Sequence, residues 1–413
     1  MSLVLEGIRV VDVSQVAAVP MAARLMADFG ADVIHVEPPK TGDSFRVIQL
    51  GLEMLTGTHS EFNYIWENYN RNKRSVTIDL SQEGGQQVLY RMLENADVFV
   101  TNLRPFELKE FNLEYGTLSR MNPKLIGGYL TGYGSEGPSK DSPAYDHTAY
   151  WARSGIPHKL MTLIPGMSGS KMPPPAFVPA FGDHMAGMCL AYGIMTALFS
   201  RERTGKGQLV EVSLFHAGLY QLSFDLSGAL ATKNDCHVFG SREEGLNPLM
   251  QLYRTQDGRW LLLSGLRPDR YWSSFCKAIG REDLEHDPRF DSFEGIIVNH
   301  VDLLHILEDV FSSKTLAEWK PILDASDVPW SPLQTLPEVV ADTQARANEF
   351  FTAFAHPVHG TVEVVANPVK LNRNPHMVRM PAPEFSQHTE EVLLEMGYSW
   401  EEIERFKHQG IIA

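Results

Sequence analysis

The sequence has few cysteines, no excess of basic residues and no long apolar run. Three of its 413 residues are cysteines, and none stands in a CxxC pair, so we expect neither a disulfide framework nor a zinc site. Lys and Arg number 36 against 51 Asp and Glu, a net charge of −15, which predicts no extended basic face for a nucleic acid or an anionic membrane. No apolar run reaches the roughly 18 residues of a membrane span.

The N-terminus also lacks the basic start and apolar core of a signal peptide. We therefore expect a cytoplasmic protein, without a metal ion, in which Cys189, Cys236 and Cys276 are free thiols. Cys189 stands inside an apolar helical run, which favours a buried packing residue over a nucleophile.

Short apolar runs alternate with helical patterns over the first 131 residues. This alternation is typical of βαβ units and a parallel sheet, in which ligands bind at the carboxyl ends of the strands. A nicotinamide dehydrogenase would have G-x-G-x-x-G after the first strand, where this chain reads SQVAAVP, so that class is disfavoured. Strands are predicted at residues 8–13, 32–36, 75–79, 97–101, 125–131 and 209–213.

The pattern changes near residue 232, where polar residues interrupt it. The QDG sequence at 256–258 separates two apolar runs and predicts a hairpin. We predict an α/β fold with an open parallel, Rossmann-like sheet formed by the N- and C-terminal parts. Its large domain takes residues 1–232, a small α+β domain takes residues 233–330, and residues 331–413 return to the large domain.

The segment Phe181-Gly182-Asp183-His184 stands directly before the apolar helix MAGMCLAYGIMTALFSR. A carboxylate at a helix start is stabilised by free N–H groups and the helix dipole, typically by about 0.3–1 kcal/mol. Asp183 is therefore either a simple N-cap or a functional carboxylate. The helix is apolar nearly all round and follows a Gly- and Pro-rich stretch expected to line a cleft, which favours a functional role.

Small residues recur along the same helix and would let a second helix approach closely. They fit an interface between domains or subunits and ordinary core packing equally well. They are Ala186, Gly187, Ala191, Gly193 and Ala197.

Six segments are informative as an ordered set: LEGIRVVDVSQVAAVPMAARLMADFGADVIHVEPP, NRNKRSVTIDL, ADVFVTNLRP, GYGSEGPSKDSPAYDHTAY, FGDHMAGM and RTGKGQLVEVS. Together they strongly resemble the class III, CaiB/BaiF-type CoA-transferases, and the similarity runs from about Leu5 to HTEEVLLEMGY at 388–398. The residues of these segments are most similar to those of the 2-hydroxyisocaproate, phenyllactate and benzylsuccinate enzymes. The resemblance implies transfer of CoA from an acyl-CoA donor to a carboxylic acid, such as a 2-hydroxy, aryl or dicarboxylic acid.

Asp183 matches the nucleophile of that family, in a G-D-x-x-x-G setting. The resemblance implies that its carboxylate attacks the thioester, giving an aspartyl anhydride and then an aspartyl-CoA thioester. Amides at the helix start are candidates to bind the oxyanion. It also implies acyl-CoA as a substrate, no tightly bound cofactor, and an interlocked homodimer or a pairing with a homologous subunit.

Other positions carry over from the family one by one. Lys73 and Arg74 are either solvated loop residues or contacts of the CoA phosphates. Position 17 has Ala where formyl-CoA transferases have Gln. The positions matching CoA contacts are Val16, Ala17, Ala18, Ile78, Asn102, Leu103, Arg104 and Tyr145; those expected near the acids are Gln15, Asp146, His184, and Gly245, Leu246 and Asn247 of a loop that matches a lid.

Two alternatives are weighed against the transferase. A 2-methylacyl-CoA racemase uses His in a G-H-D setting, whereas this chain reads Ala144-Tyr145-Asp146, and a Tyr with a pKa near ~10 is a poor base. A non-catalytic subunit would have no need of Asp183 in an intact setting. Both are disfavoured, and an obligate unlike partner stays open.

Overall fold

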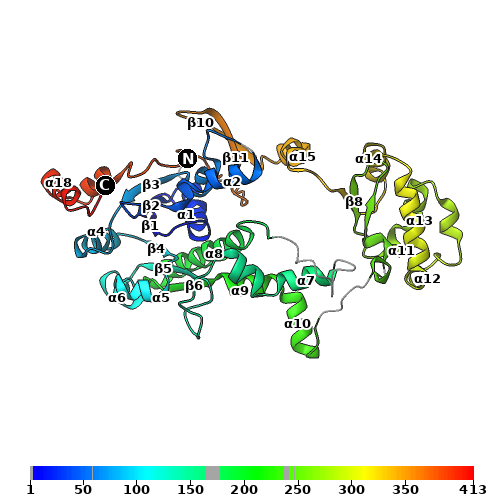
Figure 1. Cartoon of the computed structure of the whole chain (residues 1–413), viewed down its shortest axis with the longest axis horizontal. Coiled ribbons are helices and arrows are strands. Elements are labelled where there is room, and N and C mark those ends of the chain that lie inside the picture. The colour runs from blue at the N-terminus through cyan, green and yellow to red at the C-terminus, as the bar shows by residue number, and fades with distance from the viewer. Residues whose placement is uncertain (1–2, 58, 164–176, 236–240, 246) are drawn as a thin grey trace. The chain divides into compact units, whose positions relative to one another are not determined.

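The computed structural model describes residues 3–57, 59–163, 177–235, 241–245 and 247–413. They fall into two compact units, whose elements are labelled in Figure 1. The larger unit comprises the described residues of Met1–Pro157, Ala176–Asn234 and Ala347–Ala413, and the smaller unit those of His158–Pro175 and Asp235–Arg346.

The larger unit is built on a parallel sheet with the strand order β3-β2-β1-β4-β5-β6. This is the order of a Rossmann fold, and it reverses between β1 and β4, where a crevice for ligands opens. The predicted parallel sheet is confirmed, and each predicted strand ends within two residues of the observed one. The expectation that the C-terminal part contributes strands to this sheet is wrong, because all six strands lie between Arg9 and Ser213 and β10 and β11 pair only with each other. The strands are β1 (Arg9–Val13), β2 (Asp32–Glu37), β3 (Lys73–Thr77), β4 (Val98–Thr101), β5 (Ile126–Thr131) and β6 (Leu209–Ser213).

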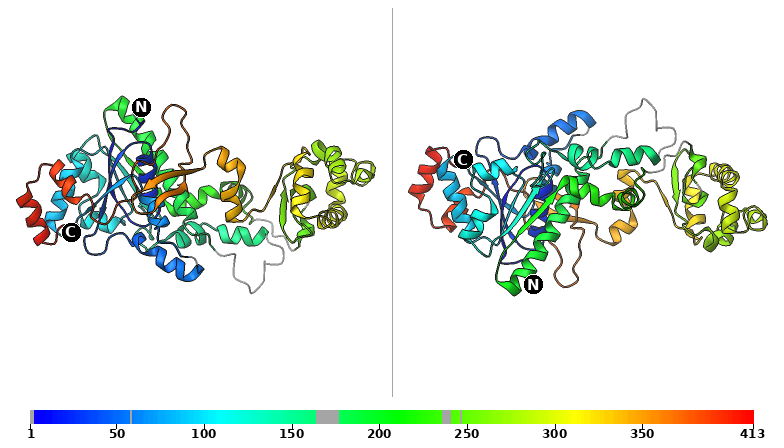
Figure 2. Two further views of the ribbon diagram at one scale, coloured as in Figure 1. Left: turned by 90° about the horizontal axis from the view of Figure 1, so that it is seen from above. Right: turned by 90° about the horizontal axis from the view of Figure 1, so that it is seen from below.

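Helices from both ends of the chain cover one face of the sheet. Their apolar side chains form one core with alternate residues of the strands. Figures 1 and 2 both show the red C-terminal helices beside the helix that follows β3. The helices on this face are α4 (Glu83–Leu93), α5 (Pro105–Glu110), α6 (Tyr115–Met121), α17 (Thr389–Glu395) and α18 (Trp400–His408).

The opposite face carries α1 (Ala18–Asp28), α3 (Tyr64–Asn70) and α8 (Phe181–Thr204). Helices α1 and α8 cross closely because Gly187 has no side chain: a Cβ there would lie 2.3 Å from the carbonyl oxygen of Ala18. A Cβ on Gly193 would lie 2.5 Å from Val210 Cγ1 in β6. These two glycines of α8 therefore serve packing inside the unit.

The thiol of Cys189 in α8 is half-buried, and burial raises its pKa, as expected of a packing residue rather than a nucleophile.

The remaining elements of the larger unit are short. The elements are η1 (Ser44–Arg46), α2 (Ile48–Thr56), the π-helical turn η2 (Asp146–Ala152), α9 (Leu214–Gln221), α10 (Ser223–Thr232), β10 (Phe351–His356) and β11 (Gly360–Val365). Helix α7 (Ile156–Leu163) begins in this unit, but its residues from His158 onward belong to the smaller unit.

The smaller unit has its own core of aromatic and aliphatic side chains around Phe275, Phe311 and Trp319. The predicted hairpin at 256–258 is confirmed, with Gly258 in the left-handed region at φ 77°. The elements are η3 (Arg242–Glu244), η4 (Pro248–Met250), β7 (Leu252–Arg254), β8 (Trp260–Leu263), α11 (Pro268–Ala278), η5 (Glu282–His286), α12 (Phe293–Val298), α13 (His300–Ser312), α14 (Leu316–Asp324), β9 (Trp330–Pro332), α15 (Leu336–Ala341) and α16 (Thr343–Ala347).

Over the described ranges, none of the helices has the length and apolar character needed to cross a membrane. Within the same ranges, His, Cys, Asp and Glu side chains form no group of three or more that could hold a metal ion. Cys236 lies outside the described residues.

Candidate active site

A cavity of about 650 Å³ lies at the carboxyl ends of the strands, within the larger unit. Loops after β1, β2, β3, β4 and β5 supply its walls, as the strand pattern predicts. Ala17 and Ala18 are buried at the start of α1 and, like Val16, do not line the cavity. Six of the residues singled out in the sequence do line it: Gln15, Ile78, Asn102, Leu103, Arg104 and Tyr145.

The loops after β1 and β4 are tied together at the point where the strand order reverses. Gln15 N–H donates to Asn102 Oδ1 at 3.2 Å, and Asn102 Nδ2 donates to the Gln15 carbonyl at 2.7 Å. The next residue, Val16, has a φ of 74°, which is unusual for a β-branched side chain. The rim of the cavity is thus a fixed backbone structure.

Two basic residues, Arg104 and Lys140, line the cavity. The Arg104 guanidinium is bound to Glu107 at 3.0 Å and stacks over the ring of Phe106 at 4.4 Å. Lys140 is exposed at the cavity wall, and no ion pair of its side chain is formed with the residues that the structure describes. Lys140 therefore offers positive charge that these residues do not balance, whereas the charge of Arg104 is balanced by Glu107, which also lines the cavity.

The expectation that Lys73 and Arg74 are solvated or bind phosphates is wrong. Strand β3 begins at Lys73, earlier than predicted, so both residues belong to the sheet. Lys73 is fully buried and its Nζ lies 2.9 Å from Asp12 Oδ2. Arg74 pairs with Asp32 at 2.7 Å and Glu395 at 2.8 Å.

Asp183 is the third residue of α8, and its side chain makes no capping hydrogen bond. The helix begins at Phe181 after Ala180, which has a φ of 61°. The interpretation of Asp183 as a simple N-cap is therefore wrong. Two first-turn amides are occupied, because Gly182 N–H donates to Asp146 Oδ1 at 3.0 Å and His184 N–H to the Ala180 carbonyl. These two are not free to bind an oxyanion.

Gly182 is required where α8 packs on η2. A Cβ at this position would lie 2.1 Å from Tyr150 Cγ and 2.2 Å from Asp146 Oδ1. Tyr145 lines the cavity, and the next residue, Asp146, binds the backbone beside Asp183. This close packing connects the cavity wall with the start of α8.

The electrostatic environment of Asp183 disfavours its ionised form. Burial, and then the charge of Asp146, raise the pKa of Asp183 to about 7. Burial also raises the pKa of Asp146, against the opposing hydrogen bond from Gly182. Asp146 Oδ2 and the indole Nε1 of Trp151 are both buried without a hydrogen-bond partner among the described residues. Two carboxyl groups of raised pKa at one site are typical of functional centres.

His184 forms a pair with Tyr69 of α3. The Tyr69 hydroxyl lies 2.8 Å from His184 Nε2, and burial, followed by Arg24, lowers the pKa of the imidazole. Burial raises the pKa of Tyr69, and the charge of Asp183 raises it further. Tyr69 is thus a site residue that the sequence reasoning missed, because it stands far from the FGDH segment in the chain.

Aromatic rings form a surface beside the start of α8. His147 and Phe177 are stacked with their centroids 5.0 Å apart, and Trp151 lies 5.9 Å from both Phe177 and Phe181. Phe177 and Phe181 are 40% and 56% exposed, respectively, so the surface is open to an apolar group.

The predicted lid residues lie in the smaller unit, apart from Leu246, which is outside the described residues. Gly245 follows η3, and Asn247 begins η4 by accepting a hydrogen bond from Leu249 N–H at 3.0 Å. The Asn247 amide also donates to the Gly265 carbonyl at 2.9 Å. Its polar atoms are therefore bound within its own unit.

The Rossmann topology, the cavity at the reversal point and the nearby carboxyl of raised pKa at a helix start are features of an α/β enzyme, although Asp183 itself does not line the cavity. The model of CoA-transferase family III matches residues 5–389. The chain is 36% identical to (R)-2-hydroxy-4-methylpentanoate CoA-transferase of Clostridioides difficile, over 99% of this chain and 100% of that one. It is 33% identical to cinnamoyl-CoA:phenyllactate CoA-transferase of Clostridium sporogenes, over 97% and 95%.

A crystal structure of a CAIB/BAIF family protein from Brucella suis is similar in fold, with a TM-score of 0.79 and 25% identity over 96% of this chain and 100% of that one. The chain belongs to CoA-transferase family III. It is a CoA-transferase that moves CoA from an acyl-CoA donor to a carboxylic acid, and the resemblance found in the sequence is confirmed.

Proposed function

We propose that Asp183 is the nucleophile of this transfer. A carboxylate oxygen attacks the thioester carbonyl of the donor, and CoA thiolate leaves to give a mixed anhydride. The thiolate then attacks the Asp183 carbonyl carbon, which releases the donor acid and gives an aspartyl-CoA thioester. The acceptor carboxylate attacks this thioester, and the released thiolate attacks the acceptor carbonyl. New acyl-CoA and free Asp183 result, without any net proton transfer.

The observation that carries this proposal is the environment of the Asp183 carboxyl. Burial and Asp146 raise its pKa to about 7, so the carboxylate is less stabilised than an ordinary surface carboxylate and correspondingly more nucleophilic. It is still ionised in a substantial fraction of molecules at neutral pH, so it can attack without a general base.

We expect the pH dependence to follow Asp183. Because only the ionised form attacks, kcat/KM for the donor should fall below pH 7, approaching about tenfold per pH unit. Asp146→Asn removes the neighbouring charge that raises the pKa of Asp183, so the fall in kcat/KM should shift to lower pH. Initial rates from pH 5 to 9 measure both profiles. A wild-type profile that is flat down to pH 5 would contradict the assignment.

CoA is proposed to occupy the cavity at the strand ends. Lys140 and Arg104 bind its phosphates, and the fixed loop from Gln15 to Ala18 receives the thioester end. The cavity wall at Tyr145 leads to Asp146 and hence to the start of α8, where the thioester must arrive.

The acceptor is proposed to be an acid with an apolar or aromatic group, such as a 2-hydroxy or aryl acid. The open rings of Phe177 and Phe181 can bury such a group beside Asp183, and aromatic pairs contribute about 0.5–1.5 kcal/mol beyond the area that they bury. The named relatives act on 2-hydroxy-4-methylpentanoate and phenyllactate.

A matrix of acyl-CoA donors against carboxylic acids, read by mass spectrometry of the acyl-CoA products, tests the function. The expected result is exchange between acids with aryl or branched groups, faster than with small dicarboxylic acids. Preference for dicarboxylic acids would contradict the acceptor class, and no exchange with any pair of donor and acid would contradict the proposed function. The chain is proposed to work in the cytoplasm.

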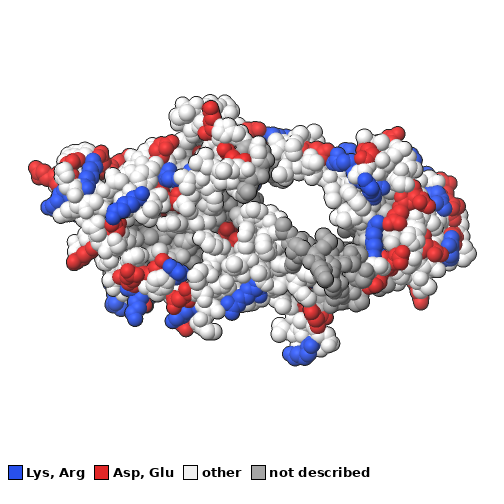
Figure 3. Space-filling model, in the orientation of Figure 1, with Lys and Arg blue, Asp and Glu red and all other residues white. Residues whose placement is uncertain are grey.

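We also propose an interlocked dimer, and α8 offers a surface for it. Met188, Tyr192, Met195 and Phe199 are spaced at four, three and four residues and are 39–76% exposed, on the side turned away from the glycines that pack on α1 and β6. The surface over α8 and α9 is mostly uncharged in the view of Figure 3. Such a contiguous apolar surface is typical of an interface.

Placing two charges in this surface should break the dimer. Tyr192→Asp combined with Phe199→Asp would bury two carboxylates, at a cost that we expect to exceed the stability of the interface. Light scattering after size exclusion should give a dimer for the wild type and a monomer for the double variant. Glu202→Gln, on the same helix, is the matched control and should stay dimeric. A monomeric wild type would contradict the proposal.

A further inference from the structure

A network of buried charged side chains lies beneath the cavity, on the face of the sheet that α1 and α3 cover. Asp12, His35 and Lys73 stand on the adjacent strands β1, β2 and β3 and are all fully buried. His35 Nδ1 lies 2.9 Å from Asp12 Oδ2, and Lys73 Nζ lies 2.9 Å from the same oxygen. Ser14 also donates a hydrogen bond to Asp12, which is thereby fully engaged.

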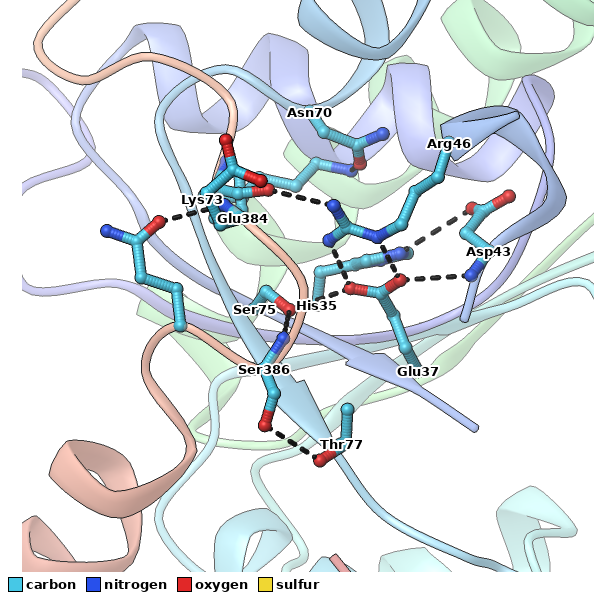
Figure 4. A network of polar contacts seen from close by, with 12 residues as sticks. His35, Glu37, Asp43, Arg46, Asn70, Lys73, Ser75, Thr77, Glu384 and Ser386 are labelled. Carbon is cyan, nitrogen blue, oxygen red and sulfur yellow. Dashed lines mark hydrogen bonds and ion pairs between the residues drawn. The ribbon is translucent and has the colours of Figure 1, made fainter. Parts of the chain in front are cut away.

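The network continues from His35 to the loop after β2, as Figure 4 shows. His35 Nε2 lies 3.6 Å from Asp43 Oδ2, an ion-pair distance longer than a hydrogen bond. The backbone N–H of Asp43 donates to Glu37 Oε2 at 2.9 Å, and Arg46 holds Glu37 in turn at 2.6 Å. Asp43 is therefore fixed from two sides.

The charge state of His35 suits this arrangement. Burial is the largest single influence and would lower its pKa, but the charge of Asp12 and the contacts with the Asp12 and Asp43 carboxylates together outweigh burial and raise the pKa to about 9. His35 is therefore an imidazolium at neutral pH, with a carboxylate on each side of the ring.

Asp43 connects the network to two backbone amides: its Oδ1 caps η1 by accepting from Phe45 N–H at 2.9 Å, and the carboxylate also reaches the cavity rim. Both oxygens of Asp43 accept from the backbone N–H of Val16, each at 3.2 Å. Val16 has a φ of 74°, a left-handed conformation that costs a β-branched residue on the order of 1–3 kcal/mol. A conformation of this cost persists only where its surroundings hold it, and Asp43 is the charged group that holds the Val16 amide.

We propose that Asp43, backed by His35, is a positioning residue that holds Val16 in its left-handed conformation and so sets the loop that receives the thioester end of acyl-CoA. This inference rests on the proposed CoA site. Asp43 acts through the backbone of Val16 and need not touch the substrate. The buried ion pairs thus position the loop, in addition to their small net contribution to the stability of the fold.

The test compares Asp43→Asn with Asp43→Asn combined with Val16→Gly. Asn keeps the shape of Asp but lacks its charge, so the loop should relax and the KM for acyl-CoA should rise roughly 10- to 100-fold with a smaller change in kcat. Gly adopts positive φ without strain, so the KM of the double variant should return most of the way to the wild-type value. A residue with a purely structural role would show no such rescue. Asp32→Asn, which breaks an ion pair on the same sheet, is the control.

A second variant leaves every buried charge intact. Val16→Pro removes the N–H group and fixes φ near −65°, so it should raise KM at least as much. Each of three results would overturn the inference. The first is an equal KM for the wild type and a folded Asp43→Asn, the second is absence of rescue by Val16→Gly, and the third is an unchanged KM in Val16→Pro. Calorimetric Kd values for acyl-CoA are measured on the same samples. Failure of transfer by the wild type would contradict the proposed function, whereas the Kd values would still decide the role of Asp43.

Discussion

Asp183→Asn should lower the rate of CoA transfer by at least about 10,000-fold, because loss of a covalent nucleophile removes the only low-barrier route. The affinity for CoA should stay within about threefold, since the carboxyl group takes part in bond making rather than in ground-state binding. Steady-state rates and calorimetric titration with CoA measure the two quantities on one preparation. Asp183→Ala should behave in the same way.

The outcome separates this mechanism from its alternatives. A variant that transfers CoA at a tenth or more of the wild-type rate would exclude Asp183 as the nucleophile. A variant that loses activity together with CoA binding would indicate a structural role at the start of α8. His184→Gln, which alters the adjacent side chain, should retain measurable transfer and serves as the comparison.

Gly182→Ala should have the second largest effect. The added methyl group would overlap the Tyr150 ring and the Asp146 carboxylate, so the start of α8 must shift and carry Asp183 with it. Displacement of a reacting group by about 1 Å costs on the order of 100-fold in rate. We expect kcat to fall by about that factor and the free energy of unfolding to fall by about 1–3 kcal/mol.

Gly116→Ala is the matched control for this substitution. Gly116 lies in α6, and a Cβ there meets no atom within 4 Å. Its variant should keep full activity and equal or slightly higher stability. If Gly182→Ala were as active as Gly116→Ala, the close packing of α8 on η2 would not position Asp183.

The sheet was predictable because each strand is a short apolar run bounded by polar residues. Its strand order was not, since pairing depends on contacts between segments far apart in the chain, such as β1 with β4. Helix α18 was missed for a related reason. Its polar sequence is anchored mainly by Ile403, which joins the core on the sheet.

Asp183 could be proposed from the sequence because its motif and its helix are contiguous. Tyr69 could not, because only the tertiary fold brings it 2.8 Å from His184. Lys73 was misplaced because lysine is usually exposed, and nothing local shows that Asp12 offers it a buried partner. The role of Asp43 was likewise hidden, since it depends on the backbone angle of Val16.

Covalent trapping is the most direct test of Asp183 as the nucleophile. The enzyme is mixed with an acyl-CoA donor in the absence of acceptor, treated with hydroxylamine, digested and analysed by peptide mass spectrometry. We expect a hydroxamate on Asp183 that forms only when acyl-CoA is present and that is absent from Asp183→Asn. Modification of another side chain, or an unmodified Asp183 in an enzyme that is actively exchanging CoA, would contradict this assignment.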